Sequence, residues 1–304
     1  MTAGAIGVMS ITPFDSEGSV DLALLRRHLE RLAAHPVSIY VCSQGSGEGL
    51  GLSLAEKEAI YRTAVDVAGR RREVVGAGIG ITGDTATAVE QVEVLSATGV
   101  AAVQVFPPRT GALRPKDGEI EGYYHEVVAA SSCPLVLGEN VTLVGYEMGP
   151  ALIERLLRSH PEITGLSYTA PGSVGQLSEF VRRNRDRVAI RTGWLHHLAN
   201  MAAAGAAGLL CFEGNVVPGL PAAVWRSLIE GRSDALDLLG RLLQVTAVLS
   251  RYGNPGSIKA VLDHLGLPSG CLRPPLRMPA DPDRAALESA WDEMTSGRPL
   301  DTWL

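Results

Sequence analysis

Four polar side chains in this sequence stand at or just after the ends of short apolar runs, where they can take part in acid/base and anion-binding chemistry. Glu139 follows one run, Ser167 and Tyr168 close the next, and Arg109 stands three residues after an earlier run. A carboxyl group and a phenol can transfer protons, and a guanidinium can hold a carboxylate or an enolate through two hydrogen bonds. Together these types predict acid/base catalysis on a small anionic substrate.

Ser167 is a candidate nucleophile, but an unassisted hydroxyl is weak at neutral pH and needs a base within hydrogen-bond reach. His196, near the start of the helix expected after residue 192, is a candidate base in type, although a histidine at a helix start is often structural. A metal ion held by Glu139, His196 or Glu213 is a further alternative. No tight ligand motif supports it, and the sequence predicts neither a metal nor another cofactor.

The turn Gly45-Ser-Gly-Glu48 is a candidate carboxylate site. Such a turn can expose consecutive backbone N–H groups, to which Ser46 adds a hydroxyl, and a helix N-terminus follows shortly after. A plain tight turn is the alternative. We expect the substrate to be bound by residues of this turn and of two other run ends: Gly45, Ser46, Gly47, Asn140 and Glu213.

Eight short apolar runs, each followed by apolar residues at helical spacing, must position these groups. Runs that are apolar at nearly every position are typical of parallel strands covered on both faces. The strands are expected at residues 5–10, 37–42, 74–78, 101–106, 134–138, 163–167, 188–192 and 208–212. The alternation predicts an α/β fold, a (β/α)8 TIM barrel, with its site at the C-terminal strand ends. A Rossmann sheet built on residues 76–80 is disfavoured, because the spacing is not G-x-G-x-x-G.

Three further helices are expected beyond the eighth strand, at residues 235–251, 255–265 and 283–293. They are too few to form a domain of their own. We therefore predict a barrel over residues 1–230 and a C-terminal helical extension over residues 231–304 packed on it, the whole being one structural domain.

Composition excludes several classes of protein. The formal net charge of −6 comes with no basic stripe, which argues against nucleic acid as a partner. The four cysteines lie far apart without a C-x-x-C motif, so neither a zinc site nor a disulfide framework is indicated. There is no signal-peptide pattern and no run of roughly 18 apolar residues, so we expect a cytoplasmic protein with no membrane partner.

Ordered motifs run through nearly the whole chain. They include Thr12-Pro-Phe14, Gly45-Ser-Gly-Glu48, Gly76-Ala-Gly78, Pro134-Leu-Val-Leu137, Gly205-Ala-Ala-Gly208, Asn254-Pro255, Lys259-Ala260 and Arg273-Pro-Pro275. Their order and spacing resemble the dihydrodipicolinate synthase and N-acetylneuraminate lyase superfamily of pyruvate-dependent class I aldolases. The resemblance implies a TIM barrel, a lyase or aldolase acting on a small 2-oxo acid, and a homodimer or homotetramer.

The catalytic residues of that family do not follow the scaffold. Relatives carry Gly-Ile/Leu-Lys-Asp/Glu at the end of the sixth strand, where the lysine forms an imine with pyruvate; here the run is Gly165-Leu-Ser-Tyr168. The proton-relay tyrosine of the family falls at Gly138 or, with a shift of one residue, at Glu139. The arginine that helps to hold the second substrate in synthases falls at Leu143, and a Pro-Tyr-Tyr motif falls at residues 107–109. Only the carboxylate-binding turn is retained.

The three lysines, Lys57, Lys116 and Lys259, are expected on the second helix, in the loop after the fourth strand and on a C-terminal helix. None ends a strand, and only Lys116 could fold in to form an imine. We therefore predict a divergent lyase or aldolase that acts on a small carboxylate by lysine-independent acid/base chemistry, with Ser167, Tyr168, Glu139 and Arg109 facing one cavity. The alternative is a non-catalytic ligand-binding paralogue that keeps the barrel and the turn.

Overall fold

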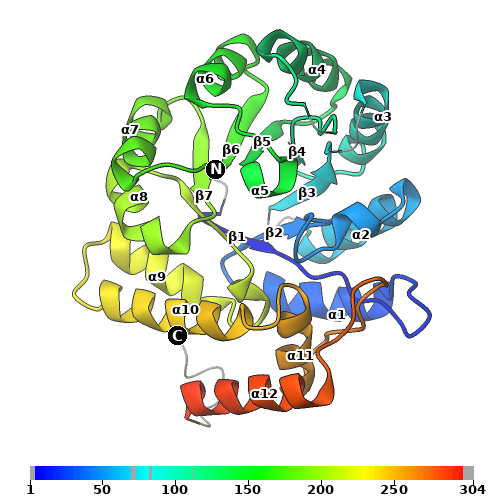
Figure 1. Ribbon diagram of the computed structural model, residues 1–304, viewed down its shortest axis with the longest axis vertical. Coiled ribbons are helices and arrows are strands. Elements are labelled where there is room, and N and C mark those ends of the chain that lie inside the picture. The colour runs from blue at the N-terminus through cyan, green and yellow to red at the C-terminus, as the bar shows by residue number, and fades with distance from the viewer. Residues whose placement is uncertain (1–3, 70–72, 82–83, 112, 297–304) are drawn as a thin grey trace. The chain divides into compact units, whose positions relative to one another are not determined.

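The structure is a computed structural model that describes residues 4–69, 73–81, 84–111 and 113–296. Eight parallel strands follow one another in chain order in a closed barrel (Figure 1). They are β1 Ile6–Met9, β2 Ser38–Val41, β3 Val74–Ile79, β4 Ala102–Val105, β5 Leu135–Asn140, β6 Ile163–Thr169, β7 Ala189–Thr192 and β8 Gly208–Cys211. The predicted barrel is confirmed, and the strands are almost entirely buried, as expected when both faces of a parallel sheet are covered.

Helices join consecutive strands. They are α1 Leu22–Ala33, α2 Leu54–Ala68, α3 Thr85–Ser96, α4 Asp117–Ala130, α5 Val141–Val144, α6 Pro150–Ser159, α7 Val174–Asn184 and α8 Leu198–Ala204, with the 3-10 turns η1 Gly49–Gly51, η2 Leu195–His197 and η3 Glu213–Asn215. After β8 come α9 Gly219–Ile229, α10 Ala235–Leu249, α11 Gly256–His264 and α12 Asp281–Thr295. The last three confirm the predicted C-terminal helices, and α10 packs against α9.

Two strands run further than expected. Both β5 and β6 extend two residues beyond their predicted ends, to Asn140 and Thr169. Glu139 and Tyr168, expected just after a strand or at its end, therefore lie inside strands. Because successive side chains of a strand point to opposite faces, this extension decides which way both side chains point.

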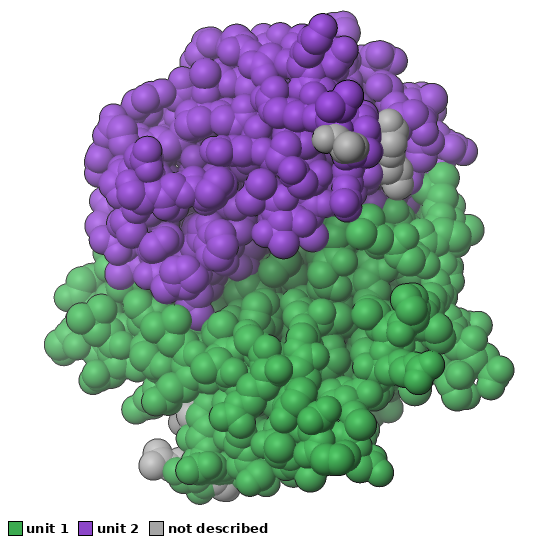
Figure 2. All heavy atoms as spheres, in the orientation of Figure 1, with its two compact units in different colours: residues 1–73, 211–304 green, residues 74–210 purple. Residues whose placement is uncertain are grey.

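The chain divides into two compact units, Met1–Glu73 with Cys211–Leu304, and Val74–Leu210 (Figure 2). We call them the first and the second unit and describe each by itself. The predicted boundary at residue 230 concerns the order of elements along the chain and stays a prediction. In the described part of the chain, no helix combines the length and the apolar character that crossing a membrane requires.

Candidate functional site

Two polar side chains, from β4 and β6, meet on the inner face of the barrel. Gln104 Nε2 donates to Ser167 Oγ at 2.5 Å, and both residues are buried. Between them lies β5, which pairs in parallel with both strands. Side chains can reach across an intervening strand only on the concave side of a barrel wall. The Ser167 hydroxyl therefore lies inside the barrel.

The strand register adds two residues to the same inner row. Ser167 is the register partner of Gly138 on β5 and of Arg191 on β7. Register partners point to the same face of a sheet, so the Arg191 side chain, which is 4% exposed, also lies inside. Sequence reasoning missed Gln104 and Arg191, although a polar residue within an otherwise apolar strand was a readable signal for both.

Gly138 leaves space that an aromatic ring takes. A Cβ atom built on Gly138 would lie 2.6 Å from Cε1 of Phe106. Phe106 packs in turn in an apolar cluster with Ile81 and with Val144 of α5. The position where the family resemblance places a tyrosine is thus part of an apolar wall.

Glu139 and Tyr168 point the other way, which corrects the expectation of one shared cavity. They are register partners one residue beyond Gly138 and Ser167, so the alternation of the strands directs them to the outer, helix-facing side. The Tyr168 ring stacks on Phe180 of α7 with centroids 4.5 Å apart, and burial raises the pKa of Tyr168. Burial also raises the pKa of Glu139 to about 7. The physical reason for the correction is the greater length of β5 and β6.

Two side chains expected to bind substrate are engaged within the fold. Asn140 caps α5, its Oδ1 atom accepting from the backbone N–H groups of residues 142 and 143 at 3.0 and 3.3 Å. Glu213 Oε1 accepts from the hydroxyl of Thr246 on α10 at 2.5 Å, and Oε2 accepts from Phe212 N at 3.1 Å. Burial raises the pKa of Glu213, which favours its neutral form. Both contacts stabilise the fold, and the substrate contacts expected of these two side chains stay predictions.

Arg109 and His196 are exposed. Within the described ranges, the Arg109 guanidinium makes no hydrogen bond or ion pair. His196 lies in η2 beside the rings of Trp194 and His197, at centroid distances of 5.4 and 4.8 Å. Among the described residues, the hydrogen bond of Ser167 Oγ is with Gln104 and not with Arg109 or His196.

The turn Gly45-Ser-Gly-Glu48, in the first unit, is only half of the expected anion nest. Gly47 N donates to Ser43 Oγ at 3.1 Å and Glu48 N donates to Gly45 O at 3.0 Å, so these two N–H groups are occupied. The N–H groups of Gly45 and Ser46 have no acceptor in the described part of the chain. The Ser46 hydroxyl is buried and accepts from Asn254 Nδ2 at 2.9 Å. Two backbone donors and one hydroxyl remain for a carboxylate.

The three lysines lie on the elements that the sequence predicts or next to them. Lys57 is buried on α2, and Lys116 is exposed directly before α4. The Lys259 amine is fully buried on α11, where it donates to the carbonyls of Thr12 and Cys271 at 2.8 and 2.6 Å and to Glu48 Oε1 at 2.6 Å. This lysine is thus held by three oxygens of the first unit.

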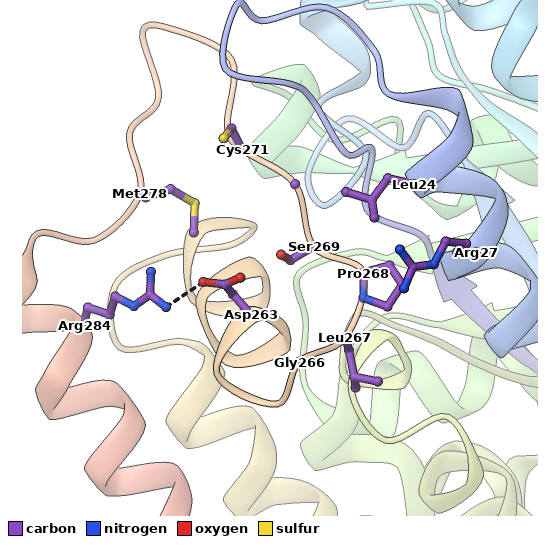
Figure 3. Close-up of a pocket in the computed structure, with 11 residues that line it drawn as sticks. Leu24, Arg27, Asp263, Gly266, Leu267, Pro268, Ser269, Cys271, Met278 and Arg284 are labelled. Carbon is purple, nitrogen blue, oxygen red and sulfur yellow. Dashed lines mark hydrogen bonds and ion pairs between the residues drawn. The ribbon is translucent and has the colours of Figure 1, made fainter.

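A cavity of about 470 Å³ in the first unit is lined by none of the predicted site residues (Figure 3). It lies beside α1, α12 and the segment 266–271, and its walls include Arg27, Cys271 and Met278. The ion pair between Asp263 and Arg284, at 2.6 Å, stands on one side. No strand end contributes to it, so it is not the candidate site. In the residues that the structure describes, no three histidine, cysteine or acidic side chains are grouped to hold a metal ion.

Comparison with known proteins gives consistent matches over nearly the whole length of the chain. The model of the dihydrodipicolinate synthetase family matches residues 2–293. The 4-hydroxy-tetrahydrodipicolinate synthase 1 of Streptomyces coelicolor is 30% identical over 289 residues, covering 94% of this chain and 92% of the relative. The synthase of the same name from Sorangium cellulosum is 30% identical over 295 residues, covering 95% of each chain.

Solved structures show the same fold. YagE, a prophage protein of the dihydrodipicolinic acid synthase family from E. coli K12 solved in complex with pyruvate, matches with a TM-score of 0.87 at 22% identity, covering 96% of this chain and 98% of that one. The dihydrodipicolinate synthase of Aquifex aeolicus matches with a TM-score of 0.86 at 23% identity, covering 96% and 97%. At these identities the likeness establishes the barrel.

Proposed function

Because the chain belongs to the dihydrodipicolinate synthetase family, we propose that it is a divergent lyase or aldolase acting on a small carboxylate, similar to a 2-oxo acid, without an imine to lysine. Support for a 2-oxo acid comes from YagE, whose structure contains pyruvate. The proposal of chemistry without an imine to lysine rests on the inner row of the barrel, where Arg191 is the register partner of Ser167.

The hydrogen bond from Gln104 directs the Ser167 hydroxyl. Since the amide N–H donates to Ser167 Oγ, the hydroxyl proton is available for an oxygen of the substrate. When a bond beside a carbonyl breaks and its electron pair stays on carbon, negative charge develops on the carbonyl oxygen. A guanidinium and a hydroxyl fixed beside that oxygen stabilise this charge. We assign this role to Arg191 and Ser167. The N–H groups of Gly45 and Ser46, in the first unit, stay a predicted carboxylate site.

Glu139 and Tyr168 support the two strands from the outer face in this proposal. Their burial and stacking hold β5 and β6, and through them the row of Gly138 and Ser167. Arg109 is exposed and stays a predicted clamp for a second carboxylate or an enolate. His196 is exposed too and stays a predicted catalytic residue.

The decisive test combines trapping with binding. The protein is incubated with pyruvate and other 2-oxo acids in the presence of borohydride, and the intact mass is measured; a lysine-bearing relative serves as the positive control. We expect no adduct, although the 2-oxo acid raises the melting temperature. Arg191→Met should lower the affinity for the 2-oxo acid about tenfold. The control Arg182→Met, at an exposed residue of α7, should leave this affinity unchanged. A stoichiometric adduct on the wild type would overturn lysine independence. Ser167→Lys tests whether an amine at this position restores trapping.

A second candidate function is non-catalytic ligand binding. It is favoured by one observation: the partner of the Ser167 hydroxyl is the amide of Gln104, which cannot take up a proton at neutral pH. Stabilisation by a 2-oxo acid that stays chemically intact on prolonged incubation would support this candidate over the enzyme.

A further inference from the structure

Beside the Ser46 turn, the first unit contains a small cavity of about 260 Å³. The turn contributes Gln44, Gly45 and Glu48 to its wall, η1 contributes Leu50, and the C-terminal segment contributes Asn254 and residues 273–276. Phe14, from the loop after β1, also lines it, so the cavity is formed by segments that are distant in sequence.

The charged groups of this cavity are neutralised within the protein. The two carboxylate oxygens of Glu48 accept from Lys259 Nζ at 2.6 Å and from Arg273 N at 3.3 Å. The Arg273 guanidinium donates to Glu56 at 2.6 Å and to the carbonyls of Gly18 and Gly51 at 2.7 and 2.8 Å. A charged ligand would lose its hydration here without gaining a counter-charge, so the cavity favours an uncharged one.

One polar group of the wall lacks a partner. Gln44 is 8% exposed, and its Nε2 atom is buried with no hydrogen-bond acceptor in the described residues. A buried donor without an acceptor is unfavourable, so a ligand that brings an acceptor relieves this cost.

The rim is apolar. Leu50 and Leu276 are exposed to 59% and 47%, and Pro274 and Pro275 also line the cavity. Apolar side chains around a few polar groups are typical of small-molecule sites. A cavity of this volume has room for a ligand with one ring.

We propose that this cavity binds a small uncharged molecule with an apolar ring and one hydrogen-bond acceptor, and that Asn254 couples its occupation to the Ser46 turn. Asn254 lines the cavity and donates to Ser46 Oγ at 2.9 Å. A ligand that contacts Asn254 therefore changes the hydrogen bonding of the Ser46 hydroxyl, which belongs to the turn predicted to bind a substrate carboxylate. The coupling rests on the proposed function, whereas the binding of the uncharged molecule does not.

The binding test uses benzamide, with benzoate as the charged analogue and toluene as the analogue without an acceptor, in calorimetric titrations of the full chain. We expect benzamide to bind at least about tenfold more tightly than either analogue, corresponding to one hydrogen bond. Gln44→Leu should remove this preference without loss of stability, since it removes an unpaired donor. Gln91→Leu is the matched control, because Gln91 on α3 is equally buried and its Oε1 atom also lacks a partner. Benzoate binding as tightly as benzamide, or a preference that survives Gln44→Leu, would overturn the proposal.

Two further measurements separate the remaining outcomes. Pyruvate is titrated with and without saturating benzamide; a changed pyruvate affinity supports the coupling, and an unchanged affinity overturns it. If benzamide binds and pyruvate does not bind at all, the proposed function is wrong, but the proposal that the cavity binds an uncharged ligand is still supported. The other occupant to test is a second copy of the chain. Sedimentation compares the oligomeric state of Leu276→Asp with that of the wild type. A lower oligomeric state of the variant would mean that the rim is a contact between copies of the chain, and would overturn the ligand site.

Discussion

The Gln104 side chain contacts Ser167 across β5, whose residue in register with Ser167 is a glycine and has no side chain. Gln104 Nε2 on β4 lies 2.5 Å from Ser167 Oγ on β6, and the register partner of Ser167 on the intervening β5 is Gly138. A larger residue at position 138 would occupy the inner face between β4 and β6. The glycine, the amide and the hydroxyl therefore form one arrangement, from which two predictions follow about how its members depend on one another.

Gly138→Ala should destabilise the protein by about 1–3 kcal/mol, because the new Cβ would lie 2.6 Å from the ring of Phe106 and force it to move. Chemical denaturation measures the free energy of unfolding. The control is Gly122→Ala on α4, where a Cβ meets nothing within 4 Å and the helix should gain about 0.5–1 kcal/mol. Equal effects of the two substitutions would contradict the close packing at Gly138.

Ser167→Ala should cost about 1–3 kcal/mol of stability, because it leaves the buried Gln104 amide without its acceptor. The double variant with Gln104→Leu should recover most of the loss, since both polar partners are then absent. Unfolding free energies of the two single variants and the double variant give the coupling between the side chains. Additive effects would show that the hydrogen bond contributes nothing.

Lys259→Met should destabilise the protein by about 3–5 kcal/mol. The substitution removes the amine of a buried ion pair and leaves the Glu48 carboxylate without its counter-charge. The control is Arg182→Ala, which breaks the exposed pair with Glu179 and should change stability by no more than about 1 kcal/mol. Thermal and chemical denaturation of both variants compare the two sites. A small loss in Lys259→Met would argue against the buried pair.

The pH dependence of stability should report Glu139. Its pKa in the folded chain is about 7, above the ordinary value of 4.5, so the native state binds this proton more tightly than the unfolded state does. This carboxyl therefore makes the free energy of unfolding fall as pH rises from about 4.5 to 7, by about 3 kcal/mol at most.

Glu139→Gln removes this ionisation and isolates its contribution. The unfolding free energy of the variant minus that of the wild type should increase between pH 4.5 and 8, because only the wild type must bury a charge at the higher pH. Denaturation curves of both proteins in matched buffers test this. A difference that stays constant with pH would mean that Glu139 titrates as it does in the unfolded chain.

The sequence by itself determined the barrel, its eight strands and the three C-terminal helices. Apolar runs and helical periodicity reflect local structure within windows of about 11 to 18 residues. The resemblance adds the order and spacing of motifs over nearly the whole chain. They also correctly placed Lys57 on the second helix and Lys259 on a C-terminal one.

Tertiary structure decided which groups meet. A difference of two residues in the ends of β5 and β6 assigned Glu139 and Tyr168 to the outer face, and no local pattern sets a strand end that accurately. Gln104 and Arg191 joined Ser167 because strand register, a property of neighbouring strands, aligned them. The Lys259 amine donates to Glu48, a residue 211 positions away in the sequence. Contacts of this kind depend on packing between distant segments, which periodicity along one segment cannot encode.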